Sequence, residues 1–314
     1  MGAYALGLAA VFAATLGLGR WVGPGEAAPA PGHGSTHDNG RPGGITAAPA
    51  GLQVTEDGYR LAPVTPTLVA GAPSPFRFRI LGPDNTPVTR YVTNHDKDLH
   101  LIVVRRDLAG FQHVHPSLAA DGTWSVPLAV AAPGQYRIFA DFQPAGRSSG
   151  LTLGIDVPAP GDYRPQALPA AARTAVVDDY TVTLDGELTP GTSSRLTASV
   201  SKDGAAVTDL QPYLGAYGHL VALRDGDLAY LHVHPDGSPG DGRTGAGPQV
   251  TFHAEVPSAG TYRLYLDFRH AGTVRTVAFT AVAGQPVPAA DQPTPATARP
   301  PAPPAGHGDG HAHG

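Results

Sequence analysis

Hydrophobic and polar residues alternate over short distances through most of the chain. From about residue 49, brief apolar-alternating runs are interrupted by Gly, Pro, Asp and Asn. A period of two is typical of β-strands, and the region shows no convincing helical period. Clear examples are PFRFRIL, LHLIVVRR, FQHVHP, TWSVPLAV and QYRIFADF. The pattern predicts an all-β protein.

The two halves of this β-region repeat each other. His100 matches His219, and the motif HVHP that begins at His113 recurs at His232, both at an offset of 119 positions. After this motif the second half carries seven extra residues in a Gly-rich loop (GSPGDGRTGAG), and the match resumes at an offset of 126 with FADF against YLDF. An ungapped match that resumes after a loop insertion indicates a duplication.

Each half has room for roughly seven strands in about 110 residues, the size of an immunoglobulin- or cupredoxin-like sandwich. We therefore predict two tandem sandwiches at residues 49–158 and 173–284, joined by a Pro/Ala-rich linker at 159–172. The Gly/Pro/Ala-rich segment 25–48 is expected to be a flexible linker, and 285–314 a disordered His-rich tail.

An apolar run of about seventeen residues lies at the N-terminus. This run, AYALGLAAVFAATLGLG, is long for the core of a signal peptide and short for a membrane span. We interpret residues 1–24 as a hydrophobic helix that serves as a signal peptide or as a membrane anchor. Either role exports the rest of the chain, which is then secreted or held at the cell surface.

Composition narrows the chemistry. The chain has no cysteine, its only methionine is Met1, and its net charge is −5. Disulfides, thiolate metal sites, lipoprotein acylation and a blue-copper centre are therefore excluded. No basic run suggests binding to nucleic acid. Histidine, with fourteen residues, is the remaining soft-to-borderline metal ligand.

The histidines of both halves follow one spacing, His, twelve residues, then His-x-His-Pro. Residues two apart on a strand point to the same face, with Cα atoms about 6–7 Å apart. If a four-residue turn at 106–109 joins two strands, His100 lies opposite His115 on that face. Three such imidazoles can bind one copper or zinc ion. The predicted ligands are His100, His113 and His115 in the first half and His219, His232 and His234 in the second.

The weight of this prediction comes from the duplication, because a single His-x-His on a strand is usually two polar residues on a solvated face. Asp141 and Asp267 recur at matched positions; each either completes a site, orients an imidazole, or bonds backbone at a strand end. His95, His253 and His270 have no counterpart and are expected at the surface. The tail is expected either to bind metal ions weakly or to have no role. The residues for weak binding would be His307, Asp309, His311 and His313.

The strings YLGAYGHLVALRDGDLAYLHVHPDG and DLHLIVVRRDLAGFQHVHP resemble exported actinobacterial proteins with YtkA-like or heavy-metal-associated domains. The resemblance covers about residues 50–284, and GAYALGLAAVFAATLGLGR is similar to the membrane-anchoring start of those proteins. The resemblance implies a β-sandwich outside the cytoplasm and a role with metal. It also implies that the six histidines named above are the metal-binding residues. The first half differs from this pattern at residues 93–98, which read TNHDKD, whereas the second half has PYLGAY at the matching residues 212–217.

Three functions follow from these patterns. The first is extracytoplasmic binding of copper or zinc in homeostasis or delivery, with a metal-transport protein as partner. The second is a copper/zinc redox enzyme of the superoxide-dismutase type, although no separate acid–base pair, nucleophile motif or phosphate loop is present. The third is an exported adhesion or interaction module in which the histidines are incidental.

Overall fold

The computed structural model describes residues 48–284, apart from the side chains of His232 and His234. All regular elements in this part are β-strands, which confirms the predicted all-β class. None of the described residues forms a helix long and apolar enough to cross a membrane. The expected helix at 1–24 and the His-rich tail at 285–314 lie outside the described residues.

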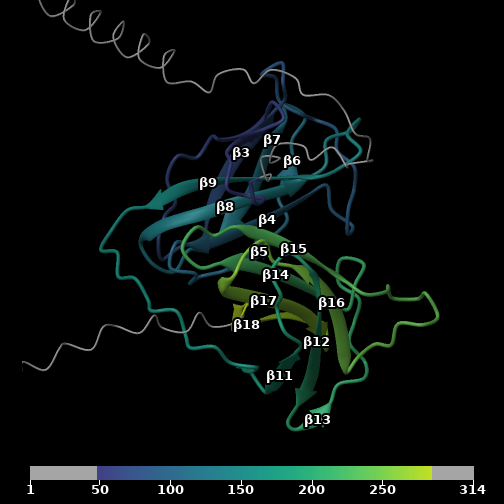
Figure 1. Cartoon of the computed structure of the whole chain (residues 1–314). Helices are drawn as coiled ribbons and strands as arrows, with labels where there is room; N and C mark the ends of the chain where they lie inside the picture. Colours follow the sequence, from purple (N-terminus) through teal and green to yellow (C-terminus); the bar gives the residue numbers. More distant parts are fainter. Residues whose placement is uncertain (1–47, 285–314) are drawn as a thin grey trace, which may run out of the picture. The chain divides into compact units, whose positions relative to one another are not determined.

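The first repeat is a sandwich of two antiparallel sheets (Figure 1). One sheet has the strand order β1 (Thr55–Glu56), β2 (Tyr59–Pro63), β3 (Ser74–Leu81), β7 (Thr123–Leu128), β6 (Ser117–Leu118). The other has the order β5 (Gln112–Val114), β4 (Leu99–Arg105), β8 (Gly134–Phe142), β9 (Leu151–Ala159).

The second repeat has the same arrangement. One layer has the order β10 (Thr174–Val177), β11 (Tyr180–Asp185), β12 (Ser193–Lys202), β16 (Gln249–Glu255), with β13 (Ala205–Ala206) also beside β12. The other has β15 (Tyr230–Pro235), β14 (Gly218–Arg224), β17 (Gly260–His270), β18 (Thr273–Ala283). Strand β15 pairs with both β14 and β16, whereas β5 and β6 share this role in the first repeat. The predicted pair of tandem, immunoglobulin-like sandwiches is therefore confirmed.

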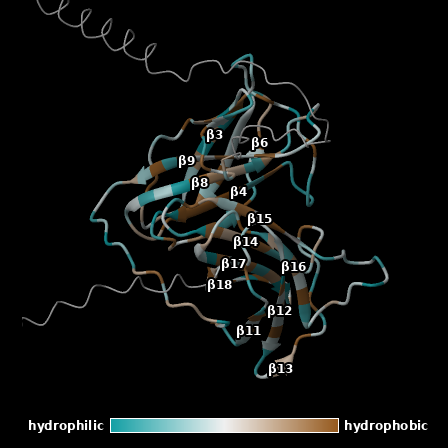
Figure 2. Ribbon diagram, viewed as in Figure 1, coloured by the Kyte–Doolittle hydropathy of each residue, from teal (hydrophilic) through white to brown (hydrophobic). Residues whose placement is uncertain are grey.

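Each sandwich encloses its own apolar core. Along β16, hydrophilic and hydrophobic residues alternate (Figure 2), and Val250, Phe252 and Ala254 are the buried ones. In the first repeat, Phe76 and Phe78 of β3 and Trp124 of β7 share a cluster with the inward residues of β4 and β8. This alternation explains why a period of two in the sequence is enough to assign the fold class.

Strands β4 and β14 break that alternation, because both of their faces are buried. Every residue of β4 is buried, and so are Gly218 to Leu223 of β14. The inward residues belong to the two sandwich cores, while the outward ones belong to a third cluster that contains residues of both repeats. We call it the junction cluster; it comprises Ile102, Val104, Leu108, Phe139, Val221, Leu223, Leu228, Tyr230 and Tyr265.

The same pair of positions meets twice in the junction. Phe111 of the first repeat stacks on Tyr265 of the second at 3.9 Å between ring centroids. Their counterparts by the repeat, Tyr230 and Phe139, lie 5.2 Å apart. A surface that contacts its own counterpart in this reciprocal way is typical of a two-fold interface, here between two halves of one chain.

Phe139→Ala should lower the free energy of unfolding by about 3–5 kcal/mol, because Phe139 is completely buried in the junction cluster. Urea denaturation followed by circular dichroism measures this change. Val176→Ala, at a strand position with 67% exposure, should stay within about 0.5 kcal/mol of wild type. Equal stabilities of the two variants would show that the junction does not stabilise the fold.

Candidate metal centre

The hairpin of the first repeat has the register that the sequence predicted. Strands β4 and β5 pair Leu101 with Val114 and Ile102 with His113, so the next position places His100 opposite His115. At the tip of the hairpin, the amide of Arg105 donates to the carbonyl of Ala109 at 2.9 Å, and the amide of Leu108 donates to the carbonyl of Arg105 at 2.8 Å. His100, His113 and His115 therefore lie on one face of the hairpin, the face that continues into the junction cluster.

The three imidazoles of the first repeat converge. Nδ1 of His100 is 3.1 Å from Nε2 of His113 and 3.1 Å from Nε2 of His115. One nitrogen from each ring lies within 4.8 Å of the other two. Bonds of about 2 Å from three nitrogens to one ion produce separations of this order. The residue types and their spacing suit a single divalent transition metal ion.

The outer nitrogens of two of these rings are held by acceptors. His100 Nε2–H donates to the carbonyl oxygen of Asn94 at 3.1 Å, and His113 Nδ1–H donates to Asp267 Oδ2 at 2.8 Å. A neutral imidazole has one N–H only, so His100 Nδ1 and His113 Nε2 carry lone pairs. Two lone pairs that face each other at 3.1 Å repel. A cation between them, a metal ion or a proton, removes this repulsion.

The cluster is shielded from water. His100 is 4% exposed, and the side chain of His113 is 5% exposed. Desolvation, followed by the nearby His113 and His100 rings, lowers the pKa of His115 to about 2. His115 is thus neutral at physiological pH, which is the form that binds a metal ion.

The two matched carboxylates act across the junction. Asp267 belongs to β17 of the second repeat but accepts from His113 of the first. Asp141 of the first repeat accepts from the hydroxyl of Tyr230 of the second at 3.2 Å. Both therefore contact side chains of the opposite repeat, a connection that the sequence alone did not suggest. In Asp267 the geometry is that of a carboxylate orienting an imidazole.

In the second repeat the backbone register is conserved, since β14 pairs Val221 with His232. His219 Nε2–H donates to the carbonyl of Tyr213 at 2.8 Å, as His100 does to Asn94. Its Nδ1 is buried and has no hydrogen-bond partner among the described side chains. Burial lowers the pKa of His219 to about 4, so this ring is also neutral. The second trio, His219, His232 and His234, stays a prediction.

His95 was expected at the surface, but it is half-buried beside the cluster. Its ring centroid lies 6.2 Å from that of His100 and 5.6 Å from that of His219. A cavity of about 420 Å³ lies here, with His95, His100, Asp141 and Tyr230 in its wall. His95 was not predicted as part of the cluster, because the prediction used only histidines that occur in both repeats.

The other unmatched histidines lie apart from the trio. The side chain of His253 is 48% exposed, as expected. His270 was also expected at the surface, but its side chain is only 14% exposed. Its Nδ1 bonds the hydroxyl of Tyr180 at 2.7 Å, and its Nε2 lies 3.0 Å from Asp209. The tail ligands His307, Asp309, His311 and His313 lie outside the described residues.

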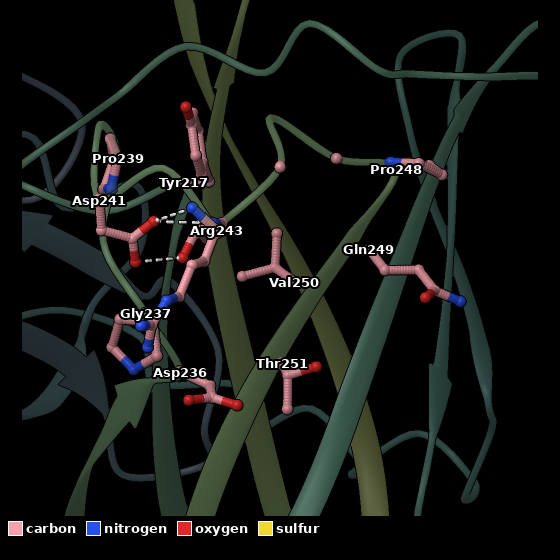
Figure 3. A pocket seen from close by; sticks show the side chains of 14 residues that line it. Tyr217, Asp236, Gly237, Pro239, Asp241, Arg243, Pro248, Gln249, Val250 and Thr251 are labelled. Carbon is pink, nitrogen blue, oxygen red and sulfur yellow. Dashed lines mark hydrogen bonds between the residues drawn. The ribbon is translucent and has the colours of Figure 1, made fainter.

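The seven-residue insertion of the second repeat borders a separate cavity of about 540 Å³. Asp241 organises this loop by accepting from the backbone amides of Arg243 and Thr244, both at 2.7 Å (Figure 3). Asp236 and Arg243 are also in the wall of this cavity. Because the carboxylate of Asp241 is used within the loop, we assign the insertion a structural role.

The hydrogen bonds of these rings predict their tautomers in the metal-free protein. His100 and His219 should carry the proton on Nε2, because both donate from that atom to a carbonyl oxygen. Long-range ¹H–¹⁵N NMR spectra near neutral pH distinguish the two ring nitrogens. A proton on Nδ1 of His100 would contradict the proposed orientation of its lone pair.

Comparison with curated proteins finds no relative of this chain. Among solved structures, the Escherichia coli adhesin FdeC is similar, with 12% identity, coverage of 74% of this chain and 65% of that chain, and a TM-score of 0.24. Invasin, a bacterial integrin-binding protein, shows 13% identity, coverage of 71% and 39%, and a TM-score of 0.20. This chain spans less than two thirds of either protein, and at such TM-scores the likeness carries no information on function.

A family model provides the firmest comparison. The model described as "Domain of unknown function (DUF8832)" matches the chain twice, at residues 53–159 and 175–285. The two matches correspond to the two sandwiches and together cover more than half of the chain. The chain therefore belongs to the DUF8832 family and carries two copies of its domain.

Proposed function

We propose that this protein binds a divalent transition metal ion, copper or zinc, through Nδ1 of His100 and Nε2 of His113 and His115. The convergence of these three nitrogens within 4.8 Å is the observation that supports the proposal. The rings of His100 and His113 are oriented by acceptors on their outer nitrogens, and burial lowers the pKa of His115 to about 2. Removing the lone-pair repulsion at 3.1 Å favours binding of a cation.

A site made of imidazole nitrogens favours copper and zinc over calcium and magnesium. Imidazole nitrogen suits copper(II) and zinc, whereas calcium and magnesium prefer oxygen ligands. Three protein ligands leave a coordination position open, as in sites that pass an ion on or bind a substrate. We assign the protein to extracytoplasmic metal homeostasis or delivery, exported by its N-terminal segment, with a metal-transport protein as partner. The resemblance of the sequence to YtkA-like and heavy-metal-associated proteins supports this proposal, because it implies a role with metal outside the cytoplasm.

An exported interaction module is the second candidate. The tandem arrangement of two β-sandwiches favours it. In such a module the buried histidines would serve packing only. A redox enzyme is a third candidate, which superoxide turnover by the metal-loaded protein would reveal.

Zinc or copper(II) should raise the melting temperature of the purified protein. An ion that binds only the folded state, at a free concentration of 100 Kd, stabilises it by about 2.7 kcal/mol. Differential scanning calorimetry with and without the ion measures the shift, and magnesium serves as the control. An interaction module with incidental histidines would melt at the same temperature in all three conditions.

Replacing His113 and His115 with Ala should remove about half of the bound metal if the two repeats bind independently, with one ion per trio. Metal analysis after dialysis gives the stoichiometry. A variant with Ala at His307, His311 and His313 is the matched control and should retain the tightly bound ions. Loss confined to that tail variant would instead make the tail the binder and contradict the assigned trio.

A further inference from the structure

The contact between His113 and Asp267 joins a ligand of one repeat to a carboxylate of the other. The two atoms are 2.8 Å apart, and the side chains are only 5% and 4% exposed. The second oxygen of Asp267 accepts from the hydroxyl of Thr276 at 2.5 Å, on the neighbouring strand β18. The carboxylate is therefore fixed on one side by its own repeat and aimed with its other oxygen at the opposite repeat.

We propose that Asp267 is the positioning residue of the first metal site, so that the site is shared between the two repeats. This inference rests on the proposed function. By accepting the proton of Nδ1, Asp267 fixes the tautomer of His113 and directs the lone pair of Nε2 toward His100 and His115. A carboxylate on the outer nitrogen also makes a ligating imidazole more basic, and its loss typically weakens metal binding about 10–100-fold.

The rest of the junction makes this arrangement rigid. Next to His113 on the same face, Ile102 enters the junction cluster with Tyr265, which lies two residues before Asp267 on β17. This apolar packing holds β17, and with it Asp267, against the hairpin that carries His113. Metal affinity in the first repeat is thereby linked to docking of the second, and one sandwich alone holds an incompletely oriented site.

The test measures zinc affinity in a reference variant that isolates the first site. This full-length variant carries Ala at His232, His234, His307, His311 and His313. Its dissociation constant for Zn²⁺ is measured by competition with a chromophoric chelator, and its Cu²⁺ form is characterised by EPR. Adding Asp267→Asn, which keeps the shape but removes the charge, should raise the dissociation constant for Zn²⁺ about tenfold or more and change the copper hyperfine splitting.

Tyr265→Phe is the matched control, because it keeps the apolar packing of the junction and removes a different buried hydrogen bond across it, from the Tyr265 hydroxyl to the carbonyl of Leu108 at 2.6 Å. It should leave the zinc affinity and the EPR spectrum unchanged. An equal loss in both variants, or no loss in Asp267→Asn, would overturn the positioning role. Should Asp267→Asn not fold, Thr276→Val carries the same prediction, since it releases the carboxylate on its other side. Failure of the reference variant itself to bind zinc would instead reject the proposed function.

Discussion

Apolar docking of the two repeats is the interaction on which the candidate site depends. The outward residues of β4 and β14 pack together in the junction cluster, and the histidines continue the same two faces. His100 stands two residues before Ile102, and His219 two residues before Val221. Residues two apart on a strand share a face, so the burial of Ile102 and Val221 also removes His100 and His219 from water. Without docking, these rings would lie on a solvated sheet.

Desolvation then determines the chemistry of the cluster. A buried imidazole resists protonation, as the lowered pKa values of His115 and His219 show. The buried carboxylate of Asp267 is in turn paired with an N–H donor. A group of neutral nitrogens supported by acceptors is well suited to a metal ion and poorly suited to water. The same burial desolvates the imidazoles and the carboxylate of Asp267 that pairs with one of them.

The two repeats differ at the turn before the first histidine. In the first repeat the turn contains His95 and Asp96, both with left-handed backbone (φ 49° and 61°). In the second, Leu214 and Gly215 occupy the same places, with φ 53° and 72°. Only Gly215 adopts this conformation without strain, so the first repeat has two non-glycine residues in the left-handed region and the second repeat has one. The imidazole of His95 lines the cavity beside His100, at a place where the second repeat has Leu214.

The sequence by itself determined the fold class, the duplication and the composition of the histidine trio. Alternation with a period of two is a local property, so strands and the shared face of His113 and His115 follow from residue order, and the turn at 106–109 sets the position of His100. The continuous apolar stretches at Ile102 and Val221 held a further signal, since burial of both faces removes alternation.

Only the tertiary structure decided which carboxylate serves which histidine, and that His95 joins the cluster. Asp267 reaches His113 from 154 positions away, across an interface that no repeat unit contains on its own. Spacing within a repeat predicts contacts inside that repeat. Contacts between repeats depend on how two folded surfaces fit together, and this is a property of packing in three dimensions.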